Sequence, residues 1–269
     1  MRSLLIGPVV LALFLSGGAG AHGSEDDLPG TEDADQGGVS EVMQELFIGE
    51  MVHAQEQWEL QGTAAGAWTH RTHSDALEAP LTLELGLTDR LQIAVEVPLL
   101  HERDGDRGQT GLGNVAGSVL YNALSQGTTG RAVSFGIEGA APAVSDDVGE
   151  DAVLLEPFVI GYLASGALAL NASVAMEVAV STQRRDTELG VELVLAALFP
   201  RGALVPSVEA GVAVDDGQFS FVLAPGLTGR LSDSVEVGAA AGARVDDAGD
   251  PALLAALHVT WEGSLSGRD

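Results

Sequence analysis

The sequence predicts an all-β protein that folds as one antiparallel transmembrane β-barrel of about 12 strands, with short periplasmic turns and longer outer loops. Three observations carry this prediction. Strictly alternating apolar and polar runs fill residues 55–262, short and long connections alternate between these runs, and an export signal precedes them. The stretch GLTDRLQIAVEVPLL, residues 86–100, shows the pattern, because one of its faces is aliphatic and the other carries small or charged groups.

The N-terminus has the features of a secretory signal peptide, which we place at residues 1–21. Arg2 precedes an apolar run at residues 4–15, and the sequence Ala19-Gly20-Ala21 fits the small-x-small cleavage pattern. The apolar run is shorter than the roughly 20 residues that a membrane helix needs, so we expect cleavage after Ala21 rather than anchoring.

An acidic, glycine-rich lead segment at residues 22–54 follows the signal and shows no periodicity. We expect it to be disordered. Within it, the stretch SEVMQELFIGEMV has two further interpretations that the sequence leaves open: a short helix capped by Ser40, or a lead into the first strand.

The alternating runs occupy residues 55–262, and residues 263–269 form a C-terminal tail. Few of the runs show a helical period of 3.6 residues, and the ambiguous region 188–200 is assigned to a strand because of its neighbours. The runs begin near Gln57, Ala79, Leu91, Gly113, Ala132, Val153, Ala167, Glu188, Ala203, Phe219, Val235 and Leu253.

The connections between the runs are of two kinds, and the two kinds alternate. TDR at residue 88 and SDS at residue 232 are short, whereas HERDGDRGQT at residue 101 and SDDVGED at residue 145 are longer and charged. A barrel of the outer membrane has short periplasmic turns and long outer loops, but a soluble sandwich has no reason to alternate them.

Alternation alone does not show which face is wet, because soluble sheets alternate too. Here the polar positions carry Glu, Thr, Ser and Asn with almost no Lys, which favours an apolar face toward lipid and a polar face toward the lumen. Tryptophan and tyrosine prefer the membrane–water boundary. The predicted membrane-interface residues are Trp58, Trp68, Tyr121, Tyr162 and Trp261.

Several turn and strand motifs resemble a known family. GLTDRLQIAVEVPLL followed by GLGNVAGSVLYNAL, and later VPSVEAGV and LAPGLTGRLSDSVEVGAAAGA, resemble segments of the outer-membrane β-barrel family of transporters assigned to the MetA pathway of phenol degradation. The likeness covers most of residues 55–262. It departs at Asn114, where the family often has Asp, and at Trp261, which is followed by a tail instead of ending the chain. The family has no uniform substrate, so the resemblance implies a barrel of transporter type and names no solute.

Carboxylates gather on the polar face of the predicted strands. The residues predicted to line the lumen are Glu59, Glu84, Glu96, Glu138, Glu177, Glu192, Glu209, Glu236 and Arg244. Such a lumen would favour cations, or its carboxylates would solvate a plugged interior. The face of Glu156 stays open, because a lumen-facing Glu156 would bring Phe158, Ile160 and Tyr162 into the lumen as well.

The composition argues against several classes of protein. A formal net charge of -27, with only 12 scattered Lys and Arg residues, argues against a nucleic-acid partner. The absence of cysteine removes thiolate nucleophiles and disulfides. His70, His73 and His101 lie near acidic residues in the predicted outer loops, but their spacing is too weak to predict a metal site or an acid–base pair. We therefore predict no catalytic residue, no metal and no cofactor.

Together, these observations predict passive passage of small solutes through an acidic lumen in the bacterial outer membrane, not an enzyme. The expected partners are outer-membrane lipid and a small-molecule solute that the sequence does not identify, and the oligomeric state is left open. Two alternatives are kept: a structural or surface-binding barrel with a closed lumen, and a secreted soluble β-sandwich.

Overall fold

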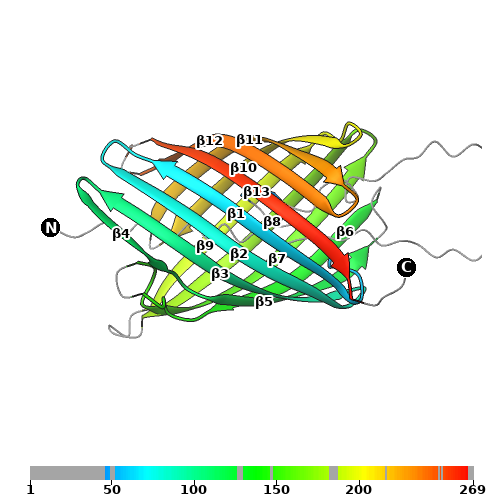
Figure 1. Ribbon diagram of the computed structural model, residues 1–269, viewed down its shortest axis with the longest axis horizontal. Coiled ribbons are helices and arrows are strands. Elements are labelled where there is room, and N and C mark those ends of the chain that lie inside the picture. Colours follow the sequence, from blue (N-terminus) through cyan, green and yellow to red (C-terminus); the bar gives the residue numbers. More distant parts are fainter. Residues whose placement is uncertain are drawn as a thin grey trace, which may run out of the picture.

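The computed structural model describes residues 46–48, 52–125, 130–145, 148–181, 187–215, 217–247, 249 and 251–265. Within these residues, 13 β-strands form one sheet that closes on itself as a barrel (Figure 1). Successive strands pair antiparallel except β4 and β5, which both pair with β3, and the first strand also pairs with the last. The strands are β1 (Glu59–His70), β2 (Ser74–Thr88), β3 (Leu91–Asp104), β4 (Arg107–Leu112), β5 (Ala116–Ser125), β6 (Arg131–Ala140), β7 (Ala152–Ser165), β8 (Leu168–Ser181), β9 (Thr187–Leu198), β10 (Leu204–Asp215), β11 (Gln218–Ser232), β12 (Val235–Asp246) and β13 (Ala252–Ser264).

The wall of the barrel has 12 strands, because β4 and β5 together make one interrupted strand. Both pair with β3: β4 along the half of β3 next to the loops, and β5 along the half next to the turn at Asp89. At the interruption, the Asn114 side chain donates to the carbonyls of Ala141 and Glu150 at 2.9 and 3.0 Å. The predicted fold class is therefore confirmed, and the single closed sheet excludes the sandwich alternative.

The observed strands follow the predicted starts closely, with two clear exceptions. The predicted outer loop HERDGDRGQT is mostly strand, because β3 runs to Asp104 and β4 begins at Arg107 and pairs back along it. β2 begins at Ser74, earlier than the expected start near Ala79, so residues 74–78 extend the strand toward the loops. Among the described residues, no helix is long and apolar enough to cross a membrane.

The two faces of the wall differ as a membrane barrel requires. On β2, Leu81 and Leu83 are 61% and 60% exposed, whereas Thr82 and Glu84, which alternate with them, are each 2% exposed. Polar side chains thus point into the barrel and aliphatic side chains point out, which is the arrangement that lipid outside and water inside select.

The connections predicted as turns and those predicted as loops lie at opposite ends of the barrel. The turns after β7 and β9 close tightly through Gly166 and Gly202, whose φ angles of 61° and 63° suit glycine. At the other end, the hairpin of β3 and β4 projects beyond the neighbouring strands (Figure 1). The predicted sorting of connection lengths holds only in part. The longest connection, from Ala140 to Ala152, lies at the loop end, but β3–β4 and β10–β11 at the same end are joined by turns as short as those at the other end.

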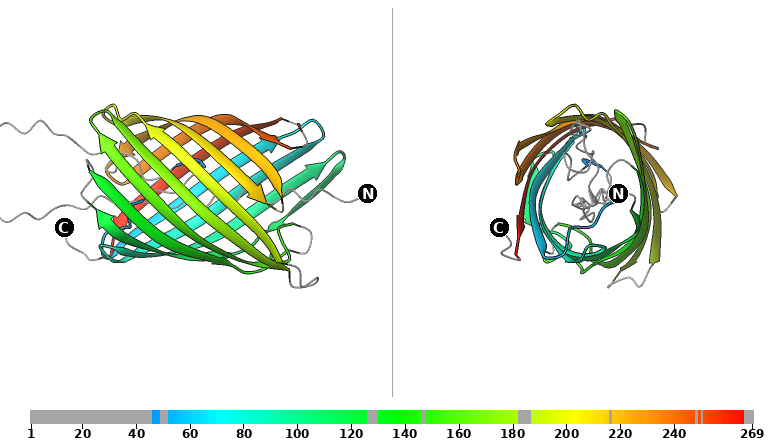
Figure 2. Two further views of the ribbon diagram at one scale, coloured as in Figure 1. Left: turned by 180° about the vertical axis from the view of Figure 1, so that it is seen from behind. Right: turned by 90° about the vertical axis from the view of Figure 1, so that its right-hand side faces the viewer.

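Residues 46–48 and 52–57, which we call the inner segment, lie inside the barrel (Figure 2, right). The residues at 46–48 and 52–55 are buried. The inner segment joins β1 at Trp58, whose φ of 65° is rare for a bulky residue and marks a sharp reversal from the lumen into the wall. The Trp58 amide donates to the Gly86 carbonyl at 2.8 Å, which fixes this reversal next to β2.

The inner segment overlaps the end of the lead segment that the sequence assigned to residues 22–54. The described residues within those bounds, 46–48 and 52–54, are packed against the wall. The signal peptide at residues 1–21 and the rest of the lead segment lie outside the described residues, as does most of the predicted tail at 263–269.

Candidate functional site: the lumen

The lumen has two halves with different contents. The half next to the short turns, which we call the filled half, holds the inner segment. The half next to the long loops, which we call the acidic half, is lined by carboxylates at the loop-side ends of several strands.

An apolar cluster ties the inner segment to the wall of the filled half. Leu46, Val52 and Ala54 contribute from the inner segment. The wall contributes Leu120, Ala132, Phe158, Ile160, Tyr162, Ala169, Ala196, Leu198 and Val205. Apolar side chains on the inner face of the barrel would be costly beside water, and here they are covered by the inner segment.

Tyr162 differs from its prediction as a membrane-interface residue. It is only 4% exposed and faces the lumen, where its ring meets the ring of His53 edge-on at 5.3 Å. The error has a physical source: β7 is apolar on both faces, so alternation does not reveal which face is inside. The same parity places Glu156 inside, together with Phe158 and Ile160, which settles the question that the sequence left open.

The other four predicted interface residues point outward. Trp58, Tyr121 and Trp261 are each 48% exposed near the short turns, and Trp68 is 40% exposed near the loops. Trp68 also stacks on His70, with ring centroids 5.4 Å apart.

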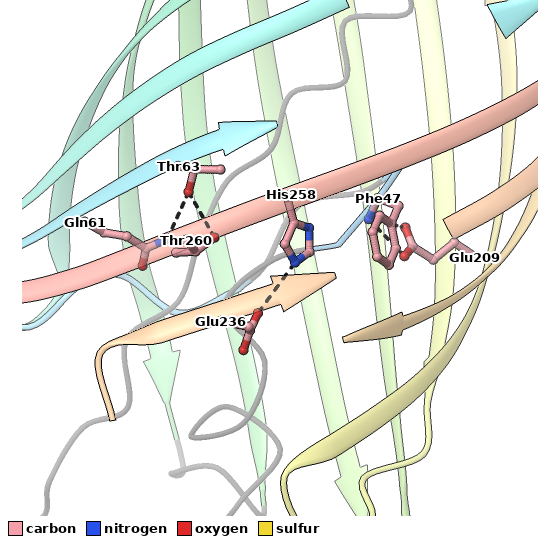
Figure 3. A network of polar contacts seen from close by, with 7 residues as sticks. All are labelled: Phe47, Gln61, Thr63, Glu209, Glu236, His258 and Thr260. Carbon is pink, nitrogen blue, oxygen red and sulfur yellow. Dashed lines mark hydrogen bonds and ion pairs between the residues drawn. The ribbon is translucent and has the colours of Figure 1, made fainter. Parts of the chain in front are cut away.

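A buried carboxylate holds the first part of the inner segment. Glu209 on β10 accepts from the Phe47 amide at 2.9 and 3.0 Å (Figure 3). It also accepts from the Ile48 amide at 2.7 Å. Two main-chain donors on one carboxylate are the type of partner that a buried negative charge needs.

The Phe47 ring lies in a recess of the wall. It stacks on the His258 ring at 4.9 Å with an interplanar angle of 17°. A Cβ atom at Gly226 would lie 2.5 Å from the ring, and one at Gly238 would lie 2.9 Å from it. Glycine at these two positions therefore leaves the space that the ring fills. His258 also lies 3.9 Å from Glu236.

Side-chain amides hold the second part of the inner segment. Asn122 donates to the Val52 carbonyl at 3.0 Å, and Ser134 donates to the same oxygen. The main-chain N–H of Gln55 donates to the side-chain oxygen of Gln92. The side-chain nitrogen of Gln92 in turn donates to Glu84 at 2.9 Å. The backbone of the inner segment is thus satisfied by wall side chains rather than by a further strand.

His53 sits between these two anchored parts and is 6% exposed. Burial lowers its pKa from 6.5 to about 4, so the ring is neutral at physiological pH. Its Nε2 atom has no hydrogen-bond partner among the described residues.

In the acidic half, carboxylates face one another across neighbouring strands. Glu138 on β6 lies opposite Glu156 on β7 in the strand register and is also within electrostatic range of Glu96 and Glu177. Glu192 adds a further carboxylate near Glu156. Like charges this close repel unless water, counter-ions or protons separate them.

The loop rim adds both signs of charge. Arg244 on β12 lies within electrostatic range of Glu192 and donates to the Ser220 hydroxyl at 3.0 Å. At the same end, burial raises the pKa of Glu150 in the β6–β7 loop, and the nearby Asp215 raises it further.

All nine residues predicted to line the lumen lie on the inner face of their strands, but they divide between the two halves. Glu84, Glu209 and Glu236 contact or neighbour the inner segment's anchors, and Glu59 accepts from the Glu56 amide at 2.8 Å where the segment enters. The residues in or beside the acidic half are Glu96, Glu138, Glu177, Glu192 and Arg244.

Sequence reasoning missed several residues of the lumen. Glu78, near Glu96, lies outside the strand that the sequence predicts, because the predicted start is near Ala79 and β2 begins at Ser74. The glutamines and glycines that hold the inner segment carry no sequence signal of their own. The apolar stretch LFI at residues 46–48, inside an acidic lead, is the feature that could have revealed them.

The histidines near the outer loops do not form one site. His70 bonds to Asp75 at 2.7 Å, whereas His101 bonds to Thr110. Among the described residues, no group of three or more His, Asp or Glu side chains could hold a metal ion.

A closed 12-stranded antiparallel barrel with an aliphatic outer face and a polar inner face defines a protein of the outer-membrane β-barrel class. No family model and no curated protein matches the chain. Solved structures do match it. The crystal structure of the COG4313 outer membrane channel from Pseudomonas putida F1 is 12% identical, with a TM-score of 0.64, and the match covers 79% of this chain and 98% of that one.

Two porin structures are similar as well. The NanC porin is 11% identical with a TM-score of 0.55, and the KdgM porin in complex with disordered oligogalacturonate is 7% identical with a TM-score of 0.53. Each match covers 74% of this chain and 98% of the porin. At these identities the likeness shows the fold.

Proposed function

We propose that this protein is an outer-membrane channel for passive passage of small solutes and that it prefers cations. The observation that carries the proposal is the acidic half, where Glu138 and Glu156 lie opposite each other with Glu96 and Glu177 nearby. Carboxylates that repel across a lumen need water and cations between them, and a ring of carboxylates makes a pore favour cations.

The structural neighbours support the channel part of the proposal, because they are an outer-membrane channel and porins. The cation part rests on the acidic half and not on these neighbours. The KdgM structure contains oligogalacturonate, a chain of negatively charged sugars. The acidic half would repel such a polyanion, so we expect this chain to exclude it. We further propose kinship with the transporters of the MetA pathway, which rests on the turn motifs alone.

The inner segment supports a second candidate function. Residues 46–48 and 52–55 are buried in the filled half and narrow the passage there. A barrel that stays closed at this level would be structural or surface-binding rather than a channel. Conductance separates the two candidates.

The decisive experiment measures reversal potentials of single channels of the refolded protein under a salt gradient. We expect cations to pass more readily than anions. Glu138→Gln combined with Glu177→Gln should reduce this preference. The matched control, Asp104→Asn with Asp106→Asn, removes two charges from exposed residues of the β3–β4 hairpin and should leave it unchanged.

Three outcomes would count against the proposal. An anion preference would mean that Arg244 and the loops set the field. An equal loss of selectivity in both double variants would mean that overall charge, not the acidic half, is responsible. The absence of any conductance would favour the closed barrel.

Location in the outer membrane is part of the same proposal and has its own test. Cysteines placed at Asp104 and Gly202 should react from opposite sides of the membrane, because these positions lie at opposite ends of the barrel. Val95→Arg should impair assembly more than Glu96→Arg, since arginine at the lipid-facing midplane costs about 2–4 kcal/mol. Equal assembly of the two variants would contradict the assignment of faces.

A further inference from the structure

The recess that holds Phe47 has the composition of a ligand site. We call it the Phe47 recess and define it by Glu209, His258, Gly226 and Gly238. Glu209 is fully buried and binds two N–H donors, His258 offers a flat ring face, and the two glycines leave the space between them.

The occupant of the recess has a simple chemical description. It is a planar aromatic ring with two N–H donors close by that reach one carboxylate, at 2.9 Å from Phe47 and 2.7 Å from Ile48. The ring stacks on His258 at 4.9 Å (Figure 3). Nothing in this description needs the occupant to belong to the chain.

We propose that the Phe47 recess is a binding subsite of the lumen for small aromatic cations, and that Phe47 occupies it as an internal ligand. A benzamidinium ion fits the requirements: its ring would replace the Phe47 ring, and its two N–H groups would replace the two main-chain donors on Glu209. The solute class is therefore an aromatic amidine or a related aromatic cation with adjacent donors.

Charge favours a cation over a neutral ligand at this subsite. Glu236 lies beside the recess, 3.9 Å from His258, and its side chain is 2% exposed. When the inner segment withdraws, Glu209 loses two donors. A ligand that brings two N–H donors and a positive charge replaces these lost donors better than a neutral ligand does.

Competition follows from this arrangement. A solute can enter the recess only when Phe47 leaves it, so binding and displacement of the inner segment are coupled. The proposal rests on the channel function above for its physiological meaning, but binding itself is measurable without any current.

The test measures benzamidine binding to the refolded full-length chain in detergent by isothermal titration. Phe47→Ala should bind benzamidine at least about tenfold more tightly than the unsubstituted chain, because the internal ring no longer competes. Adding Glu209→Gln to Phe47→Ala should weaken binding about tenfold or more, the value of a charged hydrogen-bond pair. Adding Glu192→Gln should change benzamidine binding less than about twofold. Glu192 lies in the acidic half and does not border the Phe47 recess, so its charge acts on the bound cation only through screening solvent.

Two further comparisons separate ring and charge. Benzamide keeps the flat ring but is neutral, and cyclohexanecarboxamidine keeps the charge but is not flat. Both should bind Phe47→Ala more weakly than benzamidine does. If Glu209→Gln prevents folding, Gly226→Ala in the Phe47→Ala background replaces it, because the added methyl group enters the ring space and should weaken binding.

Several results would overturn the proposal. These are the absence of saturable binding to Phe47→Ala, equal binding of benzamide and benzamidine, or greater sensitivity to Glu192→Gln than to Glu209→Gln. A channel without cation preference that still binds benzamidine at Glu209 would leave the subsite intact and reject only the proposed selectivity.

Discussion

The filled half and the acidic half of the lumen are built from the same strands by the same alternation, yet they treat buried carboxylates in opposite ways. Glu209, in the filled half, receives two main-chain N–H donors from the inner segment. Glu138, in the acidic half, faces Glu156 across the β6–β7 pair. The difference teaches that an inward-facing glutamate can be either an anchor for the chain itself or part of an aqueous wall, and that its neighbours decide which.

Solvation explains why the two arrangements need different surroundings. A carboxylate that accepts from two amides tolerates burial, because fixed donors replace its water. Facing carboxylates have no such donors from each other and depend on water, cations or protons. We therefore expect the filled half to be dry and the acidic half to be wet.

The largest effect should come from emptying the filled half. Leu46→Ser, Phe47→Ser and Ile48→Ser together remove three buried side chains and should weaken docking of the inner segment by about 5 kcal/mol. We expect a clear increase in single-channel conductance. The control, Glu138→Gln with Glu177→Gln and Glu192→Gln, should alter selectivity while leaving the size of the conductance nearly unchanged. Unaltered conductance in the serine variant would show that the inner segment does not limit passage.

Acid should loosen the filled half through His53. Its pKa is about 4 when docked and 6.5 when free, so the released segment binds more protons between these values. Docking is fully stable above pH 6.5 and loses up to about 3 kcal/mol as the pH falls toward 4. Hydrogen exchange at the Phe47 and Ile48 amides, corrected for intrinsic rates, should speed up over this window.

A His53→Gln variant tests the origin of that pH dependence. The other ionisable ring facing His53 is Tyr162, which stays neutral throughout this window. Glu209 holds the same amides and is common to both proteins. Their difference in exchange therefore isolates His53. The same acid-induced change in both proteins would assign the effect to the carboxylates instead.

The smallest effect should separate two single glutamates, one from each half. Glu84→Gln weakens the bond from Gln92 and should destabilise the folded barrel by about 1–2 kcal/mol with little change in selectivity. Glu138→Gln removes a repulsion and should be neutral or slightly stabilising while lowering cation preference. Urea unfolding in detergent and reversal potentials measure the two quantities. If Glu84→Gln lowered the cation preference and Glu138→Gln destabilised the barrel, the distinction between the two halves would be wrong.

Much of the fold could be predicted from the sequence, because alternation with a period of two is a local signal. The register at the β2–β3 turn follows the same logic. Asp89 lies five residues after Glu84 and seven before Glu96, so a hairpin centred on Asp89 predicts an offset of two residues between the two glutamates. The structure has this offset, with Glu96 opposite Thr82 and Glu84 opposite Ala94.

The inner segment could not be predicted in the same way. Its packing depends on contacts between residues distant in sequence, such as Phe47 with His258, and it has no periodicity. Without it, the apolar inner residues of β7 have no explanation, which is why Tyr162 was assigned to the wrong face. Glu78 was missed for a simpler reason, since the start of β2 was placed too late.

The pairing of β1 with β13 along their whole lengths, from Glu59 opposite Ser264 to His70 opposite Leu253, has a consequence for how the protein folds. This seam joins residues almost the full described chain apart, and pairings of such long range form slowly because the intervening chain must first be ordered. The inner segment directly precedes β1, so the closing seam encloses it. In pulse-labelled refolding we therefore expect the Phe47 and Ile48 amides to gain exchange protection no earlier than the amides of the β1–β13 seam.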